Sequence, residues 1–279
     1  MQAYPIHMYF NKMKIGVLIV IFTTFTCQAI SAQKMDSNNP RIVKVLSFNI
    51  LHGATTKGDF NLDVIAKVII DADPDFVALQ EVDYRTNRAK KYDLATELGW
   101  RVQMAPIFGR AMYYDDGEYG EAILSKHSFV QSRNVPLPFL PGYEPRAALE
   151  ITTVLPSKDT ISFIGTHLDH VTSNTNRLMQ ATEINKVFAS NPFPTILAGD
   201  LNAEPGSTTM NILEELWTAT YRKDGIKNTY PSDNPIKKID YVMFYPAERW
   251  KVIETKVIED SIASDHCAYL VTLELIPEK

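Results

Sequence analysis

Short apolar segments, many of them rich in β-branched residues, recur along the chain and constrain its fold more than any other feature. Segments of this length that are bounded by turn-forming residues are typical of buried β-strands. We therefore predict strands over residues 42–50, 76–79, 121–125, 147–154, 161–166, 195–198, 239–244, 251–257 and 268–275.

Four longer segments have apolar residues at helical spacing and lie mainly between the strands. The pattern predicts helices over residues 61–70, 92–98, 177–189 and 210–217. Residues 71–74, which include two aspartates and a proline, should stop the first helix, and Ser207 should cap the last. Many strands with few helices indicate an α/β (α+β) fold with a two-sheet core and helices outside, although periodicity leaves the strand order open.

The composition is that of an ordinary globular protein and argues for one domain. The 279 residues are 45% hydrophobic, which suffices for a large core. After residue 40 we find no repeat, low-complexity stretch or long linker, so we assign residues 41–277 to a single domain. The formal net charge of −5, without a cluster of basic residues, argues against a non-specific nuclease, which usually has a basic face.

The first residues have the pattern of a secretory signal. Lys12 and Lys14 precede a short apolar run at residues 15–25, and small and polar residues follow it. We predict a Sec-type signal peptide over residues 1–33 and a short tail over residues 34–40, and therefore export to the periplasm or the extracellular space. An uncleaved anchor remains the alternative, and the true start could be Met1, Met8 or Met13.

The two cysteines also bear on the compartment. Lipid anchoring at Cys27 is less favoured, because residues 24–26 fit a lipoprotein cleavage site poorly. Removal of the signal would leave Cys267 alone, so the exported fold must be stable without an intrachain disulfide.

Polar residues follow several of the predicted strands, where a scaffold can present side chains to a shared cleft. Each one alone is more typical of a cap or a turn, and their recurrence in a fixed order makes them informative. They are Asn49, Glu81, His167, Asp169, Asp200, Asn202, Asp240, Asp265 and His266.

The sequences around these residues resemble the endonuclease/exonuclease/phosphatase (DNase I-like) superfamily. The resemblance rests on Leu-Gln-Glu at 79–81, Thr-His-Leu at 166–168, Gly-Asp-Leu-Asn-Ala-Glu-Pro at 199–205, Ile-Asp-Tyr at 239–241 and Ser-Asp-His at 264–266. It extends from about residue 44 to 273. Residues 48–53, 79–83 and 119–125 look like a bacterial secreted branch. The resemblance implies a four-layer α/β/β/α sandwich of two mixed β-sheets flanked by helices, and a secreted phosphoesterase that depends on a divalent metal.

The resemblance also implies roles for the residues. Glu81 is the natural primary ligand of Mg²⁺, which prefers oxygen donors, and Asn49 and Asp265 would complete the metal site. Mn²⁺ could replace Mg²⁺ there. Asp200 would take the proton of the attacking water. Asn202 would orient that water, since two residues on an extended segment point to the same side.

The remaining candidates contact the phosphate or the rest of the substrate. His266 would contact the phosphate while Asp240 holds its other nitrogen, and whether His266 or Asp200 is the base stays open. His167 resembles the family's donor to the scissile phosphate. Arg146, His170 and Tyr119 are predicted to bind the substrate, with Tyr113 and Tyr119 able to stack on a ring or a lipid headgroup.

Three other polar residues have less certain roles. Asp169 more often orients a neighbour or caps a loop than binds metal, and His52 is more typical of a supporting or core position. Glu121 stands where many members of the bacterial branch have asparagine, which adds a carboxylate near the cleft. Arginines soon after Glu-Val-Asp are common in that branch, as Arg85 and Arg88 are here.

Three functions fit these residues. The favoured one is a phosphodiesterase or phosphatase acting on a small or lipid-derived phosphoester. The alternative is a secreted DNase I-like nuclease that scavenges DNA or RNA, so nucleic acid is a possible partner but not the favoured one. A binding protein without catalysis is disfavoured, because none of the acidic residues is lost. We expect a monomer with no stable membrane insertion after signal cleavage.

Overall fold

The computed structural model describes residues 41–221 and 225–278, which form two packed β-sheets with helices on both sides. The signal peptide expected at 1–33, the tail at 34–40 and the lipidation candidate Cys27 lie outside the described residues. Within those two ranges, no helix combines the length and the apolar character that crossing a membrane requires.

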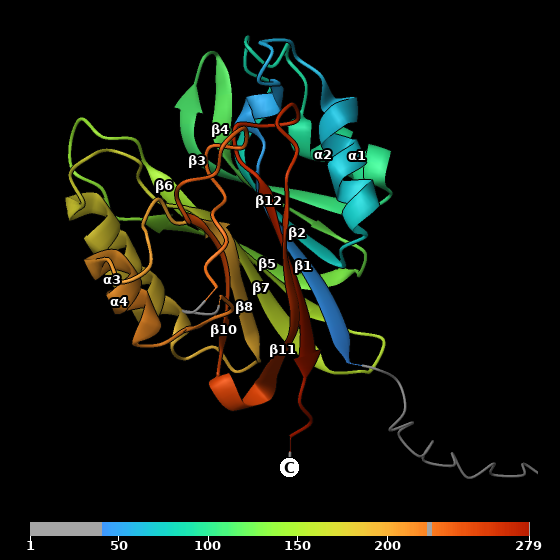
Figure 1. The fold of residues 1–279 in the computed structure, drawn as a ribbon, viewed down its shortest axis with the longest axis vertical. Helices are drawn as coiled ribbons and strands as arrows, with labels where there is room; N and C mark the ends of the chain where they lie inside the picture. The colour runs from blue at the N-terminus through green and yellow to red at the C-terminus, as the bar shows by residue number, and fades with distance from the viewer. Residues whose placement is uncertain (1–40, 222–224, 279) are drawn as a thin grey trace, which may run out of the picture. The chain divides into compact units, whose positions relative to one another are not determined.

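The first sheet has six strands in the order β11-β12-β1-β2-β4-β3 (Figure 1). Strands β1 and β2 run parallel and the other neighbours are antiparallel, so the sheet is mixed. The strands are β1 (Ile42–Asn49), β2 (Phe76–Tyr84), β3 (Ala105–Tyr114), β4 (Gly117–Ser125), β11 (Trp250–Ile258) and β12 (Ala268–Leu275).

The second sheet also has six strands, in the order β5-β6-β7-β8-β10-β9, and is mixed because β7 and β8 run parallel. Its strands are β5 (Phe129–Leu137), β6 (Arg146–Val154), β7 (Thr160–His167), β8 (Thr195–Asp200), β9 (Thr218–Ala219) and β10 (Asp240–Tyr245).

The four predicted helices are present, with ends fixed by local caps. The Asn61 side chain accepts hydrogen bonds at the start of α1 (Leu62–Ala72), and Asp73 ends that helix in the left-handed conformation. Ser207 accepts from the Met210 amide, as predicted, and begins α4 (Thr208–Glu214). The others are α2 (Leu94–Val102), α3 (Thr175–Phe188) and the short 3₁₀ helices η1 (Leu51–Gly53) and η2 (Ala247–Arg249).

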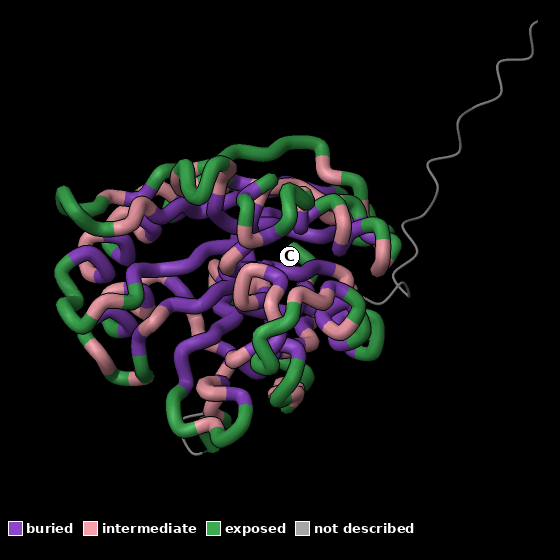
Figure 2. Tube along the Cα trace, turned by 90° about the horizontal axis from the view of Figure 1, so that it is seen from above, coloured by how far each residue is buried: buried purple, intermediate pink, exposed green. Residues whose placement is uncertain are grey.

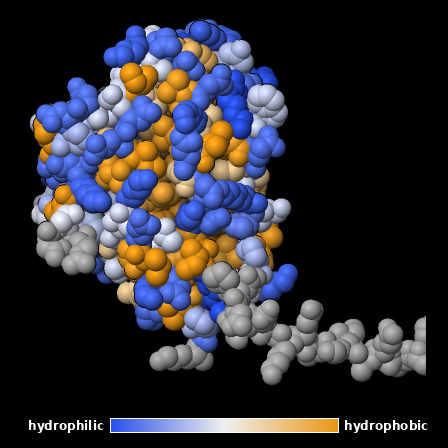
Figure 3. Space-filling view, turned by 45° about the vertical axis from the view of Figure 1, so that its right-hand side comes forward, coloured by the Kyte–Doolittle hydropathy of each residue, from blue (hydrophilic) through white to orange (hydrophobic). Residues whose placement is uncertain are grey.

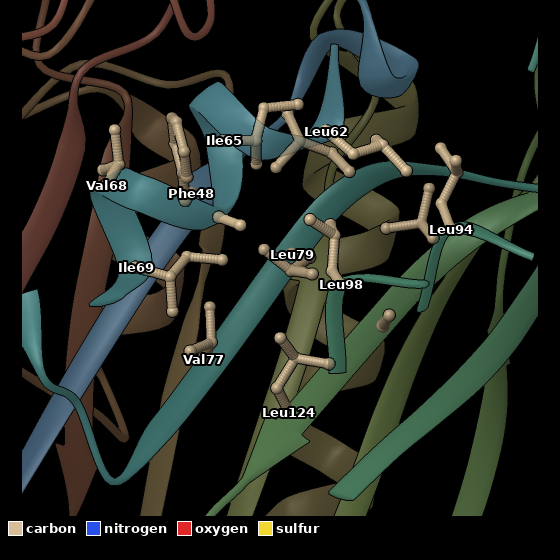
Figure 4. Close-up of a cluster of buried hydrophobic side chains, with 14 of the residues drawn as sticks. Phe48, Leu62, Ile65, Val68, Ile69, Val77, Leu79, Leu94, Leu98 and Leu124 are labelled. Atoms are coloured by element: carbon tan, nitrogen blue, oxygen red, sulfur yellow. The ribbon is translucent and has the colours of Figure 1, made fainter. Parts of the chain in front are cut away.

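Three apolar clusters separate four layers. One fills the space between the two sheets, with Phe76 and Phe163 in contact across it. The second packs α1 and α2 on the first sheet (Figure 4), and the third packs α3 and α4 on the second sheet. Figure 2 shows buried residues through the middle strands and exposed residues on the outer segments. The predicted α/β/β/α sandwich is therefore confirmed.

The sequence does not predict two long strands, β3 and β5, and both lie at the edge of a sheet. The pattern of β3 and β5 is weak because one face of each is exposed and each contains a proline, which an edge position tolerates. Strand β2 also continues past residue 79 to Tyr84, and β4 begins at Gly117 rather than at residue 121.

On the face seen in Figure 3, hydrophobic residues are interspersed with hydrophilic ones.

The topology brings the polar strand ends together at one edge of the sandwich. Asn49 pairs in register with Gln80 across the parallel β1–β2 pair, and His167 pairs with Asp200 across β7–β8. Asp240 begins β10 opposite Asp200, and Ser264 Oγ donates to the Asn49 carbonyl, which holds the chain before β12 at the end of β1.

Candidate active site

A single large cavity of about 1020 Å³ lies at the polar strand ends. Nine of the eleven residues to which the sequence assigns a metal, catalytic or substrate-binding role line it: Glu81, Tyr119, Arg146, His167, His170, Asp200, Asn202, Asp265 and His266. Asn49 and Asp240 do not line the cavity; both are fully buried, and Asn49 contacts Asp200 while Asp240 contacts His266. The fold therefore gathers residues that lie up to 217 positions apart, from Asn49 to His266, into one site.

Asn49 connects two carboxylates of the site. Its Nδ2 lies 3.1 Å from Glu81 Oε1 and 3.3 Å from Asp200 Oδ2, while its Oδ1 accepts from the Leu51 amide. Burial opposes ionisation of Glu81, but hydrogen bonds from His52 and Asn49 outweigh it and lower the pKa of Glu81 to about 2. Glu81 is thus a carboxylate over the physiological pH range.

Asp200 and Asn202 meet in the cavity, although not for the reason expected from the sequence. Strand β8 ends at Asp200, and Asn202 has a left-handed backbone (φ 47°), so the prediction that they lie on an extended segment was wrong. The turn lets the Asn202 amide donate to Asp200 Oδ1 at 2.9 Å, and it places Asn202 Nδ2 3.1 Å from His167 Nε2. A tight turn therefore brings both side chains into one wall.

His266 lies between two buried aspartates. Its Nδ1 is 3.1 Å from both carboxylate oxygens of Asp240, and its Nε2 is 3.7 Å from Asp200 Oδ2. Burial opposes the charged ring, but these two carboxylates outweigh it and raise the pKa of His266. The predicted contact between Asp240 and the second ring nitrogen is thus present, and His266 is an imidazolium at neutral pH.

The pKa of Asp200 moves upward for a related reason. Burial is the largest cause, and the neighbouring charge of Asp240 adds to it, while His266 acts in the opposite direction. Ligand atoms of Asp200, Asp240 and His266 all lie within 4.8 Å of one another, so these residues form a cluster that could hold a divalent cation.

Glu81 and Asp265 form a second group of hard oxygen donors. Burial raises the pKa of Asp265, and the negative charge of Glu81 raises it further, while the charge of His266 acts in the opposite direction. Carboxylates are donors that Mg²⁺ prefers, but Asn49 turns its Nδ2 rather than its oxygen toward Glu81. Glu81 and Asp265 could therefore hold a divalent cation, with Asn49 orienting Glu81.

Arg146 is the cationic centre of the cavity wall beside His167. Its guanidinium is almost fully buried, and it contacts Tyr119 Oη and His167 Nδ1 at 3.4 Å, His170 Nδ1 at 3.2 Å and Glu144 at 2.9 Å. Arginine can only donate, so His167 Nδ1 accepts from Arg146, while His167 Nε2 faces Asn202 Nδ2 at 3.1 Å and Asp200 Oδ2 at 3.4 Å. Burial and the charge of Arg146 lower the pKa of His167, so this ring is neutral.

The tyrosines of the β3–β4 hairpin do not act as expected. Arg88 and Arg146 lie 5.5 and 5.9 Å from the Tyr119 ring centroid, and the side chain is buried, so the ring is not free to stack on a substrate. Tyr113 is 73% exposed, packs on Arg110 and lies outside the large cavity. Tyr114 lines the cavity instead.

Three supporting residues have clear places. His52 Nδ1 lies 3.4 Å from Glu81 Oε2, which agrees with a supporting position. Asp169 is buried and accepts from Asn176 Nδ2 at 2.7 Å, so it orients a neighbour as expected. Glu121 is fully buried beneath the cavity, and neither of its carboxyl oxygens has a hydrogen-bond partner among the described residues. Burial raises its pKa well above the ordinary range.

Several residues of the cavity wall were not assigned from the sequence. Tyr230 packs on the His266 ring with centroids 4.7 Å apart, and it comes from the segment before β10, which has no periodic pattern. Arg88 was noted only as a frequent residue of the bacterial branch. The other unassigned wall residues include Tyr114, Glu144, Arg177 and Lys237.

Solved structures of similar fold come from several bacteria. A Bacteroides thetaiotaomicron endonuclease/exonuclease/phosphatase family protein is 19% identical with a TM-score of 0.71, and the alignment covers 86% of this chain and 100% of that one. A Beutenbergia cavernae protein of the same description is 23% identical (TM-score 0.68; 84% and 72% covered). A B. thetaiotaomicron mannosyl-6-phosphatase is 18% identical (TM-score 0.68; 83% and 99% covered).

The sequence itself carries the family assignment. No curated protein matches the chain. The model of the Endonuclease/Exonuclease/phosphatase family, however, matches residues 46–266, which include Asn49 at the end of β1 and the Asp265–His266 pair of the site. The family comprises hydrolases that act on phosphoesters. With both sheets, the cavity and its buried carboxylates in place, the chain belongs to the endonuclease/exonuclease/phosphatase family.

Proposed function

We propose that this protein is an exported, divalent-metal-dependent hydrolase of a small, polar phosphoester. The observation that carries the proposal is that one cavity holds an acidic group, Asp200 beside His266 and Asp240, and a cationic group built on Arg146, with His167 in contact with both Asp200 and Arg146. One group suits activation of water and the other suits binding of a phosphate. Together they match the demands of phosphoester hydrolysis.

In this proposal, Glu81 and Asp265 would hold Mg²⁺ or Mn²⁺, with Asn49 in support. A bound cation would offset their mutual repulsion and stabilise negative charge on the phosphate oxygens. The low pKa of Glu81 supports its role as a metal ligand, because the carboxylate does not have to lose a proton before it binds metal.

Asp200 is the base in this proposal and His266 is the cation. His266 keeps its proton because it lies between two carboxylates, so it is a poor acceptor for the proton of the attacking water. The raised pKa of Asp200 brings that carboxyl closer to the working pH, where a general base is most effective. Asn202, hydrogen-bonded to Asp200, orients the water or a phosphate oxygen.

His167 and Arg146 bind the scissile phosphate next to Asp200. Neutral His167 turns Nε2 toward Asp200, and the Arg146 guanidinium supplies positive charge that burial strengthens. His170, whose side chain is 57% exposed, lies at the rim beside Arg146 and contacts the leaving group.

The wall favours a polar substrate over a lipid. Charged and hydrogen-bonding side chains line most of the cavity, and the volume accommodates a group larger than a phosphate. The fold similarity to a mannosyl-6-phosphatase adds support for a phosphorylated sugar or a molecule of similar polarity. The net charge of −5 weighs against a polyanionic nucleic acid.

A parallel substrate assay tests the proposal. Purified protein with Mg²⁺ should hydrolyse p-nitrophenyl phosphate, bis-p-nitrophenyl phosphate or mannose 6-phosphate, and EDTA should abolish the activity. Plasmid DNA, RNA and sphingomyelin serve as the competing substrates. Salt-sensitive nicking of the plasmid without small-ester hydrolysis would contradict the proposed substrate class. Fractionation of cells that express the protein would test its export. Light scattering of the purified protein would test whether it is a monomer.

A further inference from the structure

Arg88 is a fixed cationic group in the cavity wall that the proposed reaction does not use. It lies in the loop after β2, and its Nε and Nη2 donate to the two oxygens of Asp83 at 2.7 and 2.9 Å. Asp83 is fully buried and also accepts from Thr86 Oγ1 at 2.6 Å. The guanidinium is therefore held by a two-point ion pair whose acidic partner cannot move.

The rest of the loop holds Arg88 from the other side. The Arg88 amide donates to Asp115 at 2.7 Å, and Lys91 forms an ion pair with Asp116 at the same hairpin turn. The guanidinium carbon lies 4.6 Å from the Tyr114 ring centroid and 5.5 Å from that of Tyr119. Such packing fixes the plane of the group, so little conformational entropy is lost when a ligand binds.

The donors that remain on Arg88 form one edge of the guanidinium. Of its five N–H groups, Asp83 takes the Nε–H and one on Nη2, which leaves two on Nη1 and one on Nη2. No acceptor among the described residues takes these three. Arg88 lines the cavity with about 30% of its side chain exposed, and the free Nη1–Nη2 edge matches a two-oxygen anion.

Arg88 is placed to contact a part of the substrate other than the reacting phosphate. Arg88 and Arg146 are both neighbours of the Tyr119 ring, with guanidinium carbons 5.5 and 5.9 Å from its centroid. Arg146 contacts His167 and so belongs to the phosphate wall, whereas Arg88 has no contact with Asp200, Asn202 or His266 among the described interactions. The cavity therefore has two separate cationic positions along one wall.

We propose that Arg88 forms a second anion subsite, which binds a carboxylate or second phosphate on the leaving group of the substrate. This inference rests on the proposed function, since it narrows the substrate class to phosphoesters that carry two oxyanions. Asp83 is a positioning residue for Arg88, and Tyr114 and Tyr119 form the apolar sides of the subsite. The structural alternative is that the Asp83–Arg88 pair only anchors the loop.

Non-hydrolysable ligands distinguish these roles. Hexylphosphonate carries one anionic head, whereas 6-phosphonohexanoate and hexane-1,6-diphosphonate add a carboxylate or a second phosphonate at the far end. Isothermal titration of the purified protein should show at least one two-headed ligand binding about tenfold or more tightly than hexylphosphonate, the difference expected from one charge-assisted two-point contact. The better of the two identifies the preferred anion.

The test variant is Arg88→Gln, and the matched control is Arg85→Gln in the same loop. Arg85 packs on Tyr84 and does not line the large cavity. Arg88→Gln should reduce the affinity ratio to within twofold of unity, while Arg85→Gln should keep the wild-type ratio. Because the ratio is taken within one protein sample, partial loss of folded protein cancels from it. Arg88→Lys, which keeps the charge but loses the fork, should give an intermediate ratio.

Three results would overturn the inference or its basis. A wild-type ratio within twofold of unity, or an equal ratio in wild type and Arg88→Gln, would show that Arg88 only anchors the loop. No binding of any phosphonate would overturn both the subsite and the proposed function. Failure to hydrolyse any phosphate ester, with the binding ratio intact, would overturn the proposed reaction and leave the subsite standing.

Discussion

Replacement of Lys238 by methionine should stabilise the protein. Lys238 is 1% exposed, and its Nζ has no hydrogen-bond partner among the described residues. Burial lowers the pKa of Lys238 to about 7, although the charge of Asp240 acts in the opposite direction. A buried ammonium without a partner is costly, and methionine has nearly the same length without the charge.

The magnitude follows from two opposing effects. A fall in pKa from 10.5 to about 7 corresponds to roughly 5 kcal/mol of lost stability once the group is charged in both states, at about 1.4 kcal/mol per pH unit. The Nζ lies 3.2 Å from the Tyr269 ring centroid, and a desolvated cation–π contact returns about 2 kcal/mol. We therefore expect Lys238→Met to raise the free energy of unfolding by about 3 kcal/mol at pH 6.

The pH dependence has a defined sign. Because the folded pKa of Lys238 is depressed, the stability that the protein has above the unfolded pKa of 10.5 is lost as the pH falls through the folded pKa of about 7. The gain from methionine should thus be largest at pH 6 and shrink toward pH 10. Urea unfolding followed by tryptophan fluorescence measures it. Exposed Lys237→Met is the control and should change stability by less than about 0.5 kcal/mol. Destabilisation, or a pH-independent gain, would refute the reasoning.

Three further substitutions test other parts of the structure. Burial raises the pKa of Glu121, so the wild-type protein should lose stability relative to Glu121→Gln as the pH rises above the ordinary pKa of 4.5, by at most about 1.4 kcal/mol per pH unit. Urea unfolding of both proteins at pH 5 and pH 7 measures this difference. The same difference in stability at both pH values would contradict the prediction. Gly199→Ala places a Cβ 2.0 Å from the Thr166 carbonyl oxygen across β7–β8, so it should lower the free energy of unfolding by at least about 2 kcal/mol, measured by thermal or urea unfolding. An unchanged free energy of unfolding would mean that the two strands are farther apart. Asp240→Asn removes a charge that raises the pKa of His266, so the alkaline limb of the pH–rate profile should shift to lower pH. An alkaline limb that does not shift would show that the reaction does not require the charge of His266.

The sequence predicted the layers and most site residues because both leave local signals. Buried central strands are mainly apolar, and caps such as Asn61 and Ser207 act within a few residues of themselves. Edge strands β3 and β5 leave no such signal, since their exposed faces tolerate polar residues and proline. Strand order depends on contacts between distant segments, and periodicity does not encode them.

The site shows the same division. Asp200, Asp240 and His266 lie at or next to strand ends within recognisable motifs, so their types and order sufficed to find them. Orientation was harder to foresee, because the left-handed turn at Asn202 and the packing of Tyr119 beside two arginines depend on tertiary structure. Arg88 joins the cavity only because buried Asp83 and the hairpin turn hold its loop, and neither contact is visible in the residue pattern.

Comparison of kcat for wild type and Asp200→Asn tests the proposed reaction most directly. The substrate is the small phosphate ester that the wild-type protein hydrolyses best with Mg²⁺. Loss of a general base should lower kcat about 10²- to 10⁴-fold while the urea-unfolding midpoint shows that the protein remains folded. A folded Asp200→Asn variant that keeps the wild-type kcat would contradict the assignment of this cavity as the site of metal-dependent phosphoester hydrolysis with Asp200 as the base.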